Sequence, residues 1–172
     1  MDHELLATDH QGVLEFFVVG LKNVSEPTVE RRELLYNASV LAHYAQVSTA
    51  SANDLPIPPT LSTVFDHFVM DASLHDDSSM MEVAGAQVLV LSGFFEDQMS
   101  GRHNIAWYAK LGATFFGRAA RFERTRAKAH LLGSIARTFE PWRDRHARLS
   151  RELRDRRYLL TPPEPPDLSP EP

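Results

Sequence analysis

Residues 80–98 constrain the fold most, because this segment is apolar on nearly every side. Its apolar positions are Val83, Ala84, Ala86, Val88, Leu89, Val90, Leu91, Phe94 and Phe95. A helix with no polar face has to be surrounded by other elements, so the segment predicts a buried central helix. Ser79 and Glu82 have the spacing of a capping box and predict that this helix begins at Met80.

The clearest amphipathic stripe in the chain precedes this segment. It consists of Leu61, Val64, Phe65, Phe68 and Val69, which recur at intervals of three and four residues. This spacing places them on one face of a helix that lies on a core. Three prolines come before the stripe, and they predict a loop over residues 48–60.

Similar periodicity predicts helices along the rest of the chain. They cover residues 8–22, 27–45, 104–139 and 141–160. Thr8 and Gln11 form a second capping-box pattern at the start of the first of these helices. Prolines suit a first helical turn, so Pro27 and Pro141 predict two more helix starts.

Two of these segments leave alternatives open. Residues 13–21 are rich in β-forming side chains, so a buried strand competes there with the expected helix. The helix over residues 104–139 either runs unbroken or bends near residues 123–125. It contains Gly112 and Gly117, each of which costs on the order of 1 kcal/mol in a helix interior. We therefore expect the central helix to approach both glycines too closely for a side chain.

Together these elements predict an all-α fold, a single helical-bundle-like domain of about six helices over residues 1–160. The length of 172 residues and the 43% of hydrophobic residues fit one core of ordinary size. The basic helices of this domain cover residues 118–160. Residues 161–172 are too rich in proline and polar side chains to pack, so we expect a mobile, polyproline-like tail.

One part of the chain resembles a known pattern. The segments LSGFF at 91–95 and WYAKLG at 107–112, followed by Phe115 and Phe116, are similar to a pattern in uncharacterised bacterial all-helical proteins. The resemblance covers residues 80–121, about a quarter of the chain. It implies an all-helical fold and a bacterial protein, and it brings no activity, ligand or catalytic residue with it.

The composition excludes several kinds of chemistry. The chain contains no cysteine, which rules out disulfides, thiolate zinc sites and iron–sulfur clusters. It has no glycine-rich phosphate loop and no G-x-S-x-G motif, so the familiar nucleotide-binding and hydrolase sites are not expected. Its N-terminus is acidic, and no apolar run approaches the roughly 20 residues of a membrane-spanning helix. We expect a cytoplasmic protein with no cofactor and no membrane contact.

The charges of the chain are segregated. Residues 1–117 carry 5 basic and 15 acidic side chains, a net charge of −10, whereas residues 118–157 carry 13 and 5, a net charge of +8. Complementary potentials steer association. The basic segment can therefore dock on the acidic body of its own chain, on a second copy, or on another polyanion.

The last basic helix predicts an interaction surface. Its apolar residues form a narrow stripe, which suits a helix partner better than a broad core does. The neighbouring arginines can bind carboxylates or phosphates in a bidentate manner. The expected interaction residues are Trp142, Arg145, Arg148, Leu149, Leu153 and Arg156. We expect a non-enzymatic interaction or regulatory protein that uses this helix to bind itself or a protein partner, and a nucleic-acid accessory factor is an alternative.

A second alternative is a small helical metal-binding protein or enzyme centred on three polar residues. His67, Asp71 and His75 stand at successive intervals of four, so they can share one helix face. Two imidazoles and a carboxylate, with a water, are a sufficient ligand set for zinc or iron. The apolar stripe of the same helix points inward, however, which places Asp66 and His67 on the solvated face and disfavours the site.

Overall fold

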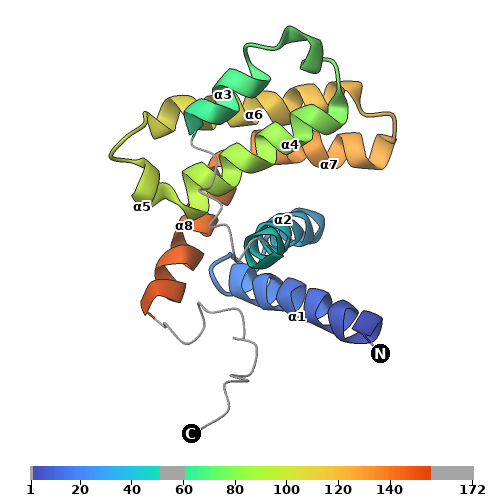
Figure 1. Ribbon diagram of the computed structural model, residues 1–172, viewed down its shortest axis with the longest axis vertical. Helices are drawn as coiled ribbons and strands as arrows, with labels where there is room; N and C mark the ends of the chain where they lie inside the picture. The colour runs from blue at the N-terminus through green and yellow to red at the C-terminus, as the bar shows by residue number, and fades with distance from the viewer. Residues whose placement is uncertain (1, 51–60, 156–172) are drawn as a thin grey trace, which may run out of the picture.

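The computed structural model describes residues 2–50 and 61–155, and these residues form an all-α fold, as the sequence predicts. They hold eight α-helices and no strand (Figure 1). The helices are α1 (Asp2–Asn23), α2 (Arg31–Ala50), α3 (Leu61–Phe68), α4 (Ser78–Leu89), α5 (Glu96–Met99), α6 (Ile105–Phe122), α7 (Arg126–Arg137) and α8 (Phe139–Asp155). A 3₁₀ turn, η1 (Ala72–Leu74), precedes α4, and a π-helical turn, η2 (Val90–Phe94), follows it. Arg156 and the expected tail at 161–172 lie outside the described residues.

The helices form two groups that α8 connects (Figure 1). In one group α4, α6 and α7 pack side by side, and α3 lies against α4. In the other group α1 and α2 form a hairpin, which contacts α7 and α8. α8 touches η2 and members of both groups. Within residues 2–50 and 61–155, no helix combines the length and the apolar character needed to cross a bilayer.

The most buried stretch is α4 together with η2, which confirms the predicted centre of the fold. Its buried apolar residues are Met81, Ala84, Val88, Leu89, Val90 and Leu91. The prediction of one regular helix over residues 80–98 is wrong, because η2 interrupts it. The Phe95 N–H donates to the Val90 carbonyl five residues earlier at 3.0 Å, which is the spacing of a π turn.

η2 is the place where α8 crosses the central stretch. A Cβ atom on Gly93 would lie 2.9 Å from the His146 Cβ and 3.0 Å from the Arg143 carbonyl oxygen, so only glycine lets the two backbones meet here. The Arg143 guanidinium also donates to the Ser92 carbonyl at 3.2 Å. This contact depends on a helix much later in the chain, which is why the local periodicity did not predict the π turn.

The Asp77 side chain, which is not part of the predicted capping box, sets the start of α4. The Asp77 carboxylate accepts a hydrogen bond from the Met80 N–H at 3.2 Å and caps the helix. α4 therefore begins at Ser78 and not at Met80. The prediction that Ser79 and Glu82 mark the start is wrong.

Two predicted starts near the N-terminus are also wrong. α1 begins before Thr8, so the capping-box pattern at that position lies within the helix. α2 begins four residues after Pro27, because the Glu30 carboxylate accepts the Glu33 N–H at 2.8 Å and caps the helix there. Residues 13–21 are helical, so the strand alternative is excluded.

The two glycines of α6 have different surroundings. A Cβ atom on Gly112 would lie 2.5 Å from the Phe139 ring and 2.7 Å from a Val88 methyl group, which confirms a close neighbour at this position. Gly117 has nothing within 4 Å, so the same prediction is wrong there. α6 ends before Glu123, whose ψ of 132° is extended. The bend near residues 123–125 is therefore the correct alternative for residues 104–139.

Candidate interaction surface

The apolar stripe of α8 is buried inside the fold of its own chain. Trp142, Leu149 and Leu153 are 1%, 2% and 6% exposed. Leu149 packs on α1, where a Cβ atom on Gly20 would lie 2.9 Å from its Cδ1 atom. The prediction that these residues form an exposed seam is therefore wrong. A stripe of two apolar residues per heptad predicts a narrow helix contact, and here helices of the same chain fill it.

Three arginines of α8 pair with acidic residues of α5. Arg143 lies 3.3 Å from the Glu96 carboxylate, and Arg151 lies 3.4 Å from it. Arg154 binds Asp97, and this hydrogen bond lowers the pKa of the Asp97 carboxyl. The acidic charge of α5 is thus balanced by α8.

The two predicted interaction arginines within the described residues are also engaged. The Arg145 guanidinium lies 4.4 Å from the centre of the Trp142 ring, a cation–π distance, and 3.6 Å from the Glu26 carboxylate. Arg148 pairs with Asp144, one turn earlier in α8, at 3.0 Å. The basic helix therefore docks on the acidic body of its own chain, one of the three possibilities that the charge segregation left open.

A buried carboxylate holds α8 against α2 and α7. Glu33 of α2 is 6% exposed and accepts a hydrogen bond from the Trp142 indole N–H at 3.0 Å. It also accepts hydrogen bonds from the Ser134 hydroxyl at 3.1 Å and from the Thr138 hydroxyl. A carboxylate removed from water needs several donors to offset its lost hydration, and these three supply them.

A buried imidazole continues this polar contact. His146 and Asn37 are fully buried, and the His146 Nε2 lies 2.8 Å from the Asn37 Oδ1. The Asn37 amide donates to the Glu33 carbonyl at 2.8 Å, so its Oδ1 accepts and the Nε2 of His146 carries the proton. Burial lowers the pKa of His146 to about 3. The imidazole is therefore neutral and joins α8 to α2.

The sequence did not single out these buried polar residues, although it carries a signal for them. Glu33 and Asn37 recur at a spacing of four within the apolar face of α2. His146 follows Trp142 by four positions and precedes Leu149 by three, so it lies on the apolar stripe of α8. A polar residue at helical spacing within an apolar stripe is a candidate for a buried hydrogen-bonded contact.

His67, Asp71 and His75 are not gathered into a metal site. α3 ends at Phe68, so the three residues do not share one helix face. Asp71 caps η1 and accepts bonds from the Ser73 hydroxyl and N–H, which lower its pKa. The His75 Nε2 lies 2.9 Å from the Phe68 carbonyl oxygen. Across residues 2–50 and 61–155, no group of three or more histidine, aspartate or glutamate side chains could hold a metal ion.

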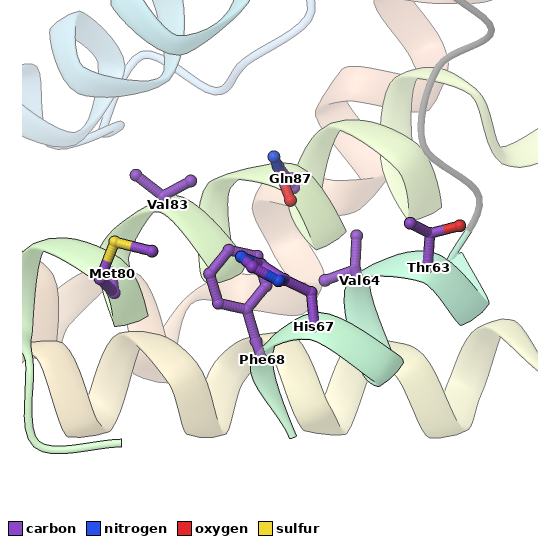
Figure 2. A pocket seen from close by; sticks show the side chains of 7 residues that line it. All are labelled: Thr63, Val64, His67, Phe68, Met80, Val83 and Gln87. Atoms are coloured by element: carbon purple, nitrogen blue, oxygen red, sulfur yellow. The ribbon is translucent and has the colours of Figure 1, made fainter. Parts of the chain in front are cut away.

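His67 lines a hollow of about 330 Å³ between α3 and α4 (Figure 2). The lining residues are Thr63, Val64, His67, Phe68, Met80, Val83 and Gln87. The His67 and Phe68 rings meet edge to face, with centroids 4.6 Å apart. Because His67 is the one ionisable side chain in this lining, the hollow offers no pair of groups for acid–base chemistry.

A second set of arginines lies on α6, on the turn into α7 and at the first residue of α7, and it is exposed. The set consists of Arg118, Arg121, Arg124 and Arg126, and we call it the α6–α7 basic surface. None of the four forms an ion pair with another described residue. Glu123 lies among them in sequence but accepts a hydrogen bond from the Thr125 N–H at 3.1 Å and lies 3.3 Å from the Ser78 hydroxyl. Within the described part of the chain, no carboxylate neutralises these guanidinium groups.

Lys128, close by on α7, does not belong to this surface. It pairs with Glu82 of α4 at 3.1 Å, and the same carboxylate accepts a hydrogen bond from the Tyr36 hydroxyl at 3.0 Å. Burial raises the pKa of Tyr36, so the phenol stays protonated and donates. This contact joins α2, α4 and α7 and leaves Lys128 neutralised.

The outer side of α6 extends the basic surface toward the start of the helix. Trp107, Lys110, Arg118 and Arg121 are exposed and lie at helical spacing on this side. The Trp107 ring is 47% exposed and packs against the Phe65 ring, with centroids 5.5 Å apart. The outer side of α6 thus combines an aromatic ring with three cations.

No protein-family model, no curated protein and no solved structure matches this chain. The resemblance over residues 80–121 therefore stays a prediction. Among the described residues, the α6–α7 basic surface gathers four exposed arginines without an ion pair.

Proposed function

We propose that the protein is a non-enzymatic interaction protein that binds an acidic partner protein through the α6–α7 basic surface. The observation that carries the proposal is a contrast between two sets of arginines. The described arginines of α8 are balanced by the chain's own carboxylates, whereas those of the α6–α7 basic surface have no such partner within residues 2–50 and 61–155. Planar guanidinium groups bind carboxylates in bidentate geometry, so this surface suits an acidic protein.

The proposed binding surface lies on α6 and the start of α7, and not on α8 as expected from the sequence. The apolar residues of α8 that were expected to contact a partner, Trp142, Leu149 and Leu153, are in the core. A partner could reach them only if the chain unfolded. The arginines on α6 can be reached without any rearrangement.

The limited size of the basic surface favours a protein over a nucleic acid. The chain as a whole carries a net charge of −5, so the attraction of an acidic partner has to be local to this surface. An acidic protein concentrates its charge in a patch that can match one basic surface. We further propose that the protein acts in the bacterial cytoplasm, in line with the resemblance over residues 80–121 and with the absence of cysteine.

Charge reversal on the basic surface tests the proposal. In the variant Arg118→Glu, Arg121→Glu, Arg124→Glu, each change replaces a cation that no described residue neutralises, so the fold should persist. Proteins that co-purify with the wild type would be identified by mass spectrometry, and each candidate pair would be reconstituted from purified components. We expect the variant to bind its acidic partner at least about 10-fold more weakly.

A matched control carries the same change of charge elsewhere. Arg31→Glu, Arg32→Glu, Arg137→Glu also replaces three exposed arginines that form no ion pair with the described residues. The control should retain wild-type affinity. Equal affinity of both triple variants for the reconstituted partner would contradict the proposed surface.

A nucleic-acid accessory function is the second candidate, and the exposed Trp107 favours it. An aromatic ring beside cations is the usual composition of a single-strand binding site, where bases stack on the ring. Fluorescence anisotropy with a labelled single-stranded RNA and a labelled DNA duplex at low salt separates the candidates. Binding that is lost in Trp107→Ala would favour the nucleic acid, and no detectable binding would remove it.

A further inference from the structure

We infer that the acidic partner of the α6–α7 basic surface is a second copy of this chain, an inference that rests on the function proposed above. The basic surface has an acidic neighbour on the connection from α3 to α4. There Asp71, Asp76 and Asp77 are all exposed. We call the two halves together the end surface, which consists of Asp71, Asp76, Asp77, Arg118, Arg121 and Arg124.

Hydrogen bonds hold the two halves beside each other. Ser78, which follows the aspartates, donates to the Ala119 carbonyl of α6 at 2.8 Å and lies 3.3 Å from the Glu123 carboxylate. The start of α4 and the α6–α7 turn accordingly lie at the same end of the molecule (Figure 1). The acidic and basic halves therefore form one continuous surface.

The halves do not neutralise each other within one chain. The Asp77 carboxylate is held by the Met80 N–H at the cap of α4, and Asp71 is held by Ser73. Within the described residues, no aspartate of the end surface lies within ion-pair distance of its arginines. Both halves thus present their charges to the outside.

An aromatic side chain lies at the border between the halves. Phe122 is 39% exposed, and the Arg121 guanidinium lies 5.7 Å from the centre of its ring. Helical spacing puts Phe122 between Arg118, on the solvent side, and Ala119, on the side that faces α4. An exposed aromatic residue ringed by charges is the usual composition of the centre of an interface.

This arrangement is complementary to itself. In a two-fold symmetric pair, each surface patch meets the same patch of the other copy. A rotation about an axis near Phe122 brings the aspartates of each copy onto the arginines of the other, so every ion pair forms twice. An interface made mainly of charged residues predicts a weak dimer with a dissociation constant on the order of 10 μM.

Sedimentation velocity on the full chain tests this dimer. At about 100 μM protein and low salt we expect a dimer, because this concentration exceeds the expected dissociation constant. At about 1 M salt, where the screening length is about 3 Å, we expect a monomer. A wild-type chain that stays monomeric at low salt overturns the inference.

Complementary charge reversals then test the pairing. One variant, Arg118→Glu, Arg121→Glu, Arg124→Glu, makes both halves of the end surface acidic. The other variant, Asp71→Lys, Asp76→Lys, makes both halves mainly basic. Each variant alone should be monomeric. A mixture of the two should form a heterodimer, because most of the repelling pairs become attracting ones. If the aspartate variant loses its helical signal, Asp76→Lys alone replaces it, since Asp76 caps no helix.

Two outcomes of this experiment overturn the inference: dimers formed by either variant alone, or a mixture that stays monomeric. The variant Arg31→Glu, Arg32→Glu, Arg137→Glu should dimerise like the wild type, and its failure to do so would show that net charge alone controls association. The proposed function can survive without the dimer, if a different acidic protein still binds the wild type and not the α6 arginine variant. The dimer can likewise survive without a further partner.

Discussion

The two arginine-rich regions of this chain share a composition and differ in their surroundings. On α8, Arg143, Arg151 and Arg154 pair with carboxylates of α5. On α6, Arg118 and Arg121 face solvent without an ion pair to any described residue. A run of arginines in a sequence therefore does not by itself predict a binding surface. The acidic residues that the fold brings near the arginines have to be known as well.

The same contrast extends to what lies beneath each set of arginines. α8 carries Trp142, Leu149 and His146 into the core, where apolar packing and buried hydrogen bonds fix it. α6 also buries one side, yet its outer side carries exposed cations and the half-exposed Trp107, whose ring packs on Phe65. α8 is thus a structural element, and the outer side of α6 is the candidate for recognition.

The largest expected effect comes from placing a charge in the buried stripe of α8. Leu149→Asp should lower the free energy of unfolding by more than about 4 kcal/mol, because it buries an unpaired carboxylate and leaves a cavity. Urea unfolding followed by circular dichroism measures this. The neighbouring exposed change Arg148→Ala should stay within about 0.5 kcal/mol of the wild type. A stable Leu149→Asp chain would mean that α8 is not docked as described.

Removal of the buried carboxylate should have the next largest effect. Glu33→Ala leaves the donors of Ser134, Thr138 and Trp142 without their acceptor, which should cost about 3 kcal/mol. The same urea experiment measures it, with the exposed change Glu15→Ala as a control. A loss no larger than that of the control would show that the hydrogen bonds to Glu33 contribute little to docking α8.

The dependence of stability on pH sharpens the comparison further. Burial lowers the pKa of His146 to about 3, while the unfolded chain keeps the ordinary value of about 6.5. Between these values the unfolded chain binds a proton that the folded chain does not. The free energy of unfolding should therefore fall as the pH falls from about 6.5 toward 3, by up to about 1.4 kcal/mol per pH unit from this group, and this contribution is complete above pH 7.

Substitution of the imidazole tests this assignment. His146→Gln keeps a side-chain N–H donor for Asn37 and removes the titration, so the slope of stability against pH should become shallower. The exposed change His130→Gln should leave the slope as it is in the wild type. An unchanged slope in His146→Gln would place the acid sensitivity elsewhere.

The smallest effects come from the arginines themselves. Arg151→Ala, Arg154→Ala removes exposed ion pairs and should lower the free energy of unfolding by at most about 1 kcal/mol. The variant Arg118→Ala, Arg121→Ala removes no ion pair with a described residue and should change the free energy of unfolding by less than about 0.5 kcal/mol. Thermal unfolding of the two double variants, measured side by side at low salt, compares them. A larger loss of stability in the Arg118→Ala, Arg121→Ala variant would contradict the assignment of α8 as the structural element and of α6 as the recognition element.

Local periodicity predicted most of the fold, because helix formation depends on nearby residues. The stripe that begins at Leu61 became α3, and the apolar segment 80–98 became the centre. The predicted starts of α2 and α4 were misplaced because two acidic residues near the predicted caps act as caps instead. Glu30 and Asp77 accept hydrogen bonds from backbone N–H groups in the first turns of these helices. The π turn at η2 was missed because it depends on α8, a distant partner.

The candidate site was less predictable, for a related reason. The stripe of Trp142, Leu149 and Leu153 correctly indicated a narrow helix contact, but sequence spacing does not say which chain provides the other side. The acidic partners of Arg143 and Arg151 lie on α5, about 50 residues away in the sequence. Only the folded arrangement separates neutralised arginines from available ones.

Chemical modification of arginine tests this separation most directly. The folded full chain would be treated briefly with phenylglyoxal at low salt, and peptide mass spectrometry would give the modification rate of each arginine. We expect Arg118, Arg121 and Arg124 to react several times faster than Arg143 and Arg145, whose guanidinium groups are ion-paired and largely buried. Equal rates for the two sets, or faster modification of Arg143 and Arg145, would contradict the separation of the two sets of arginines.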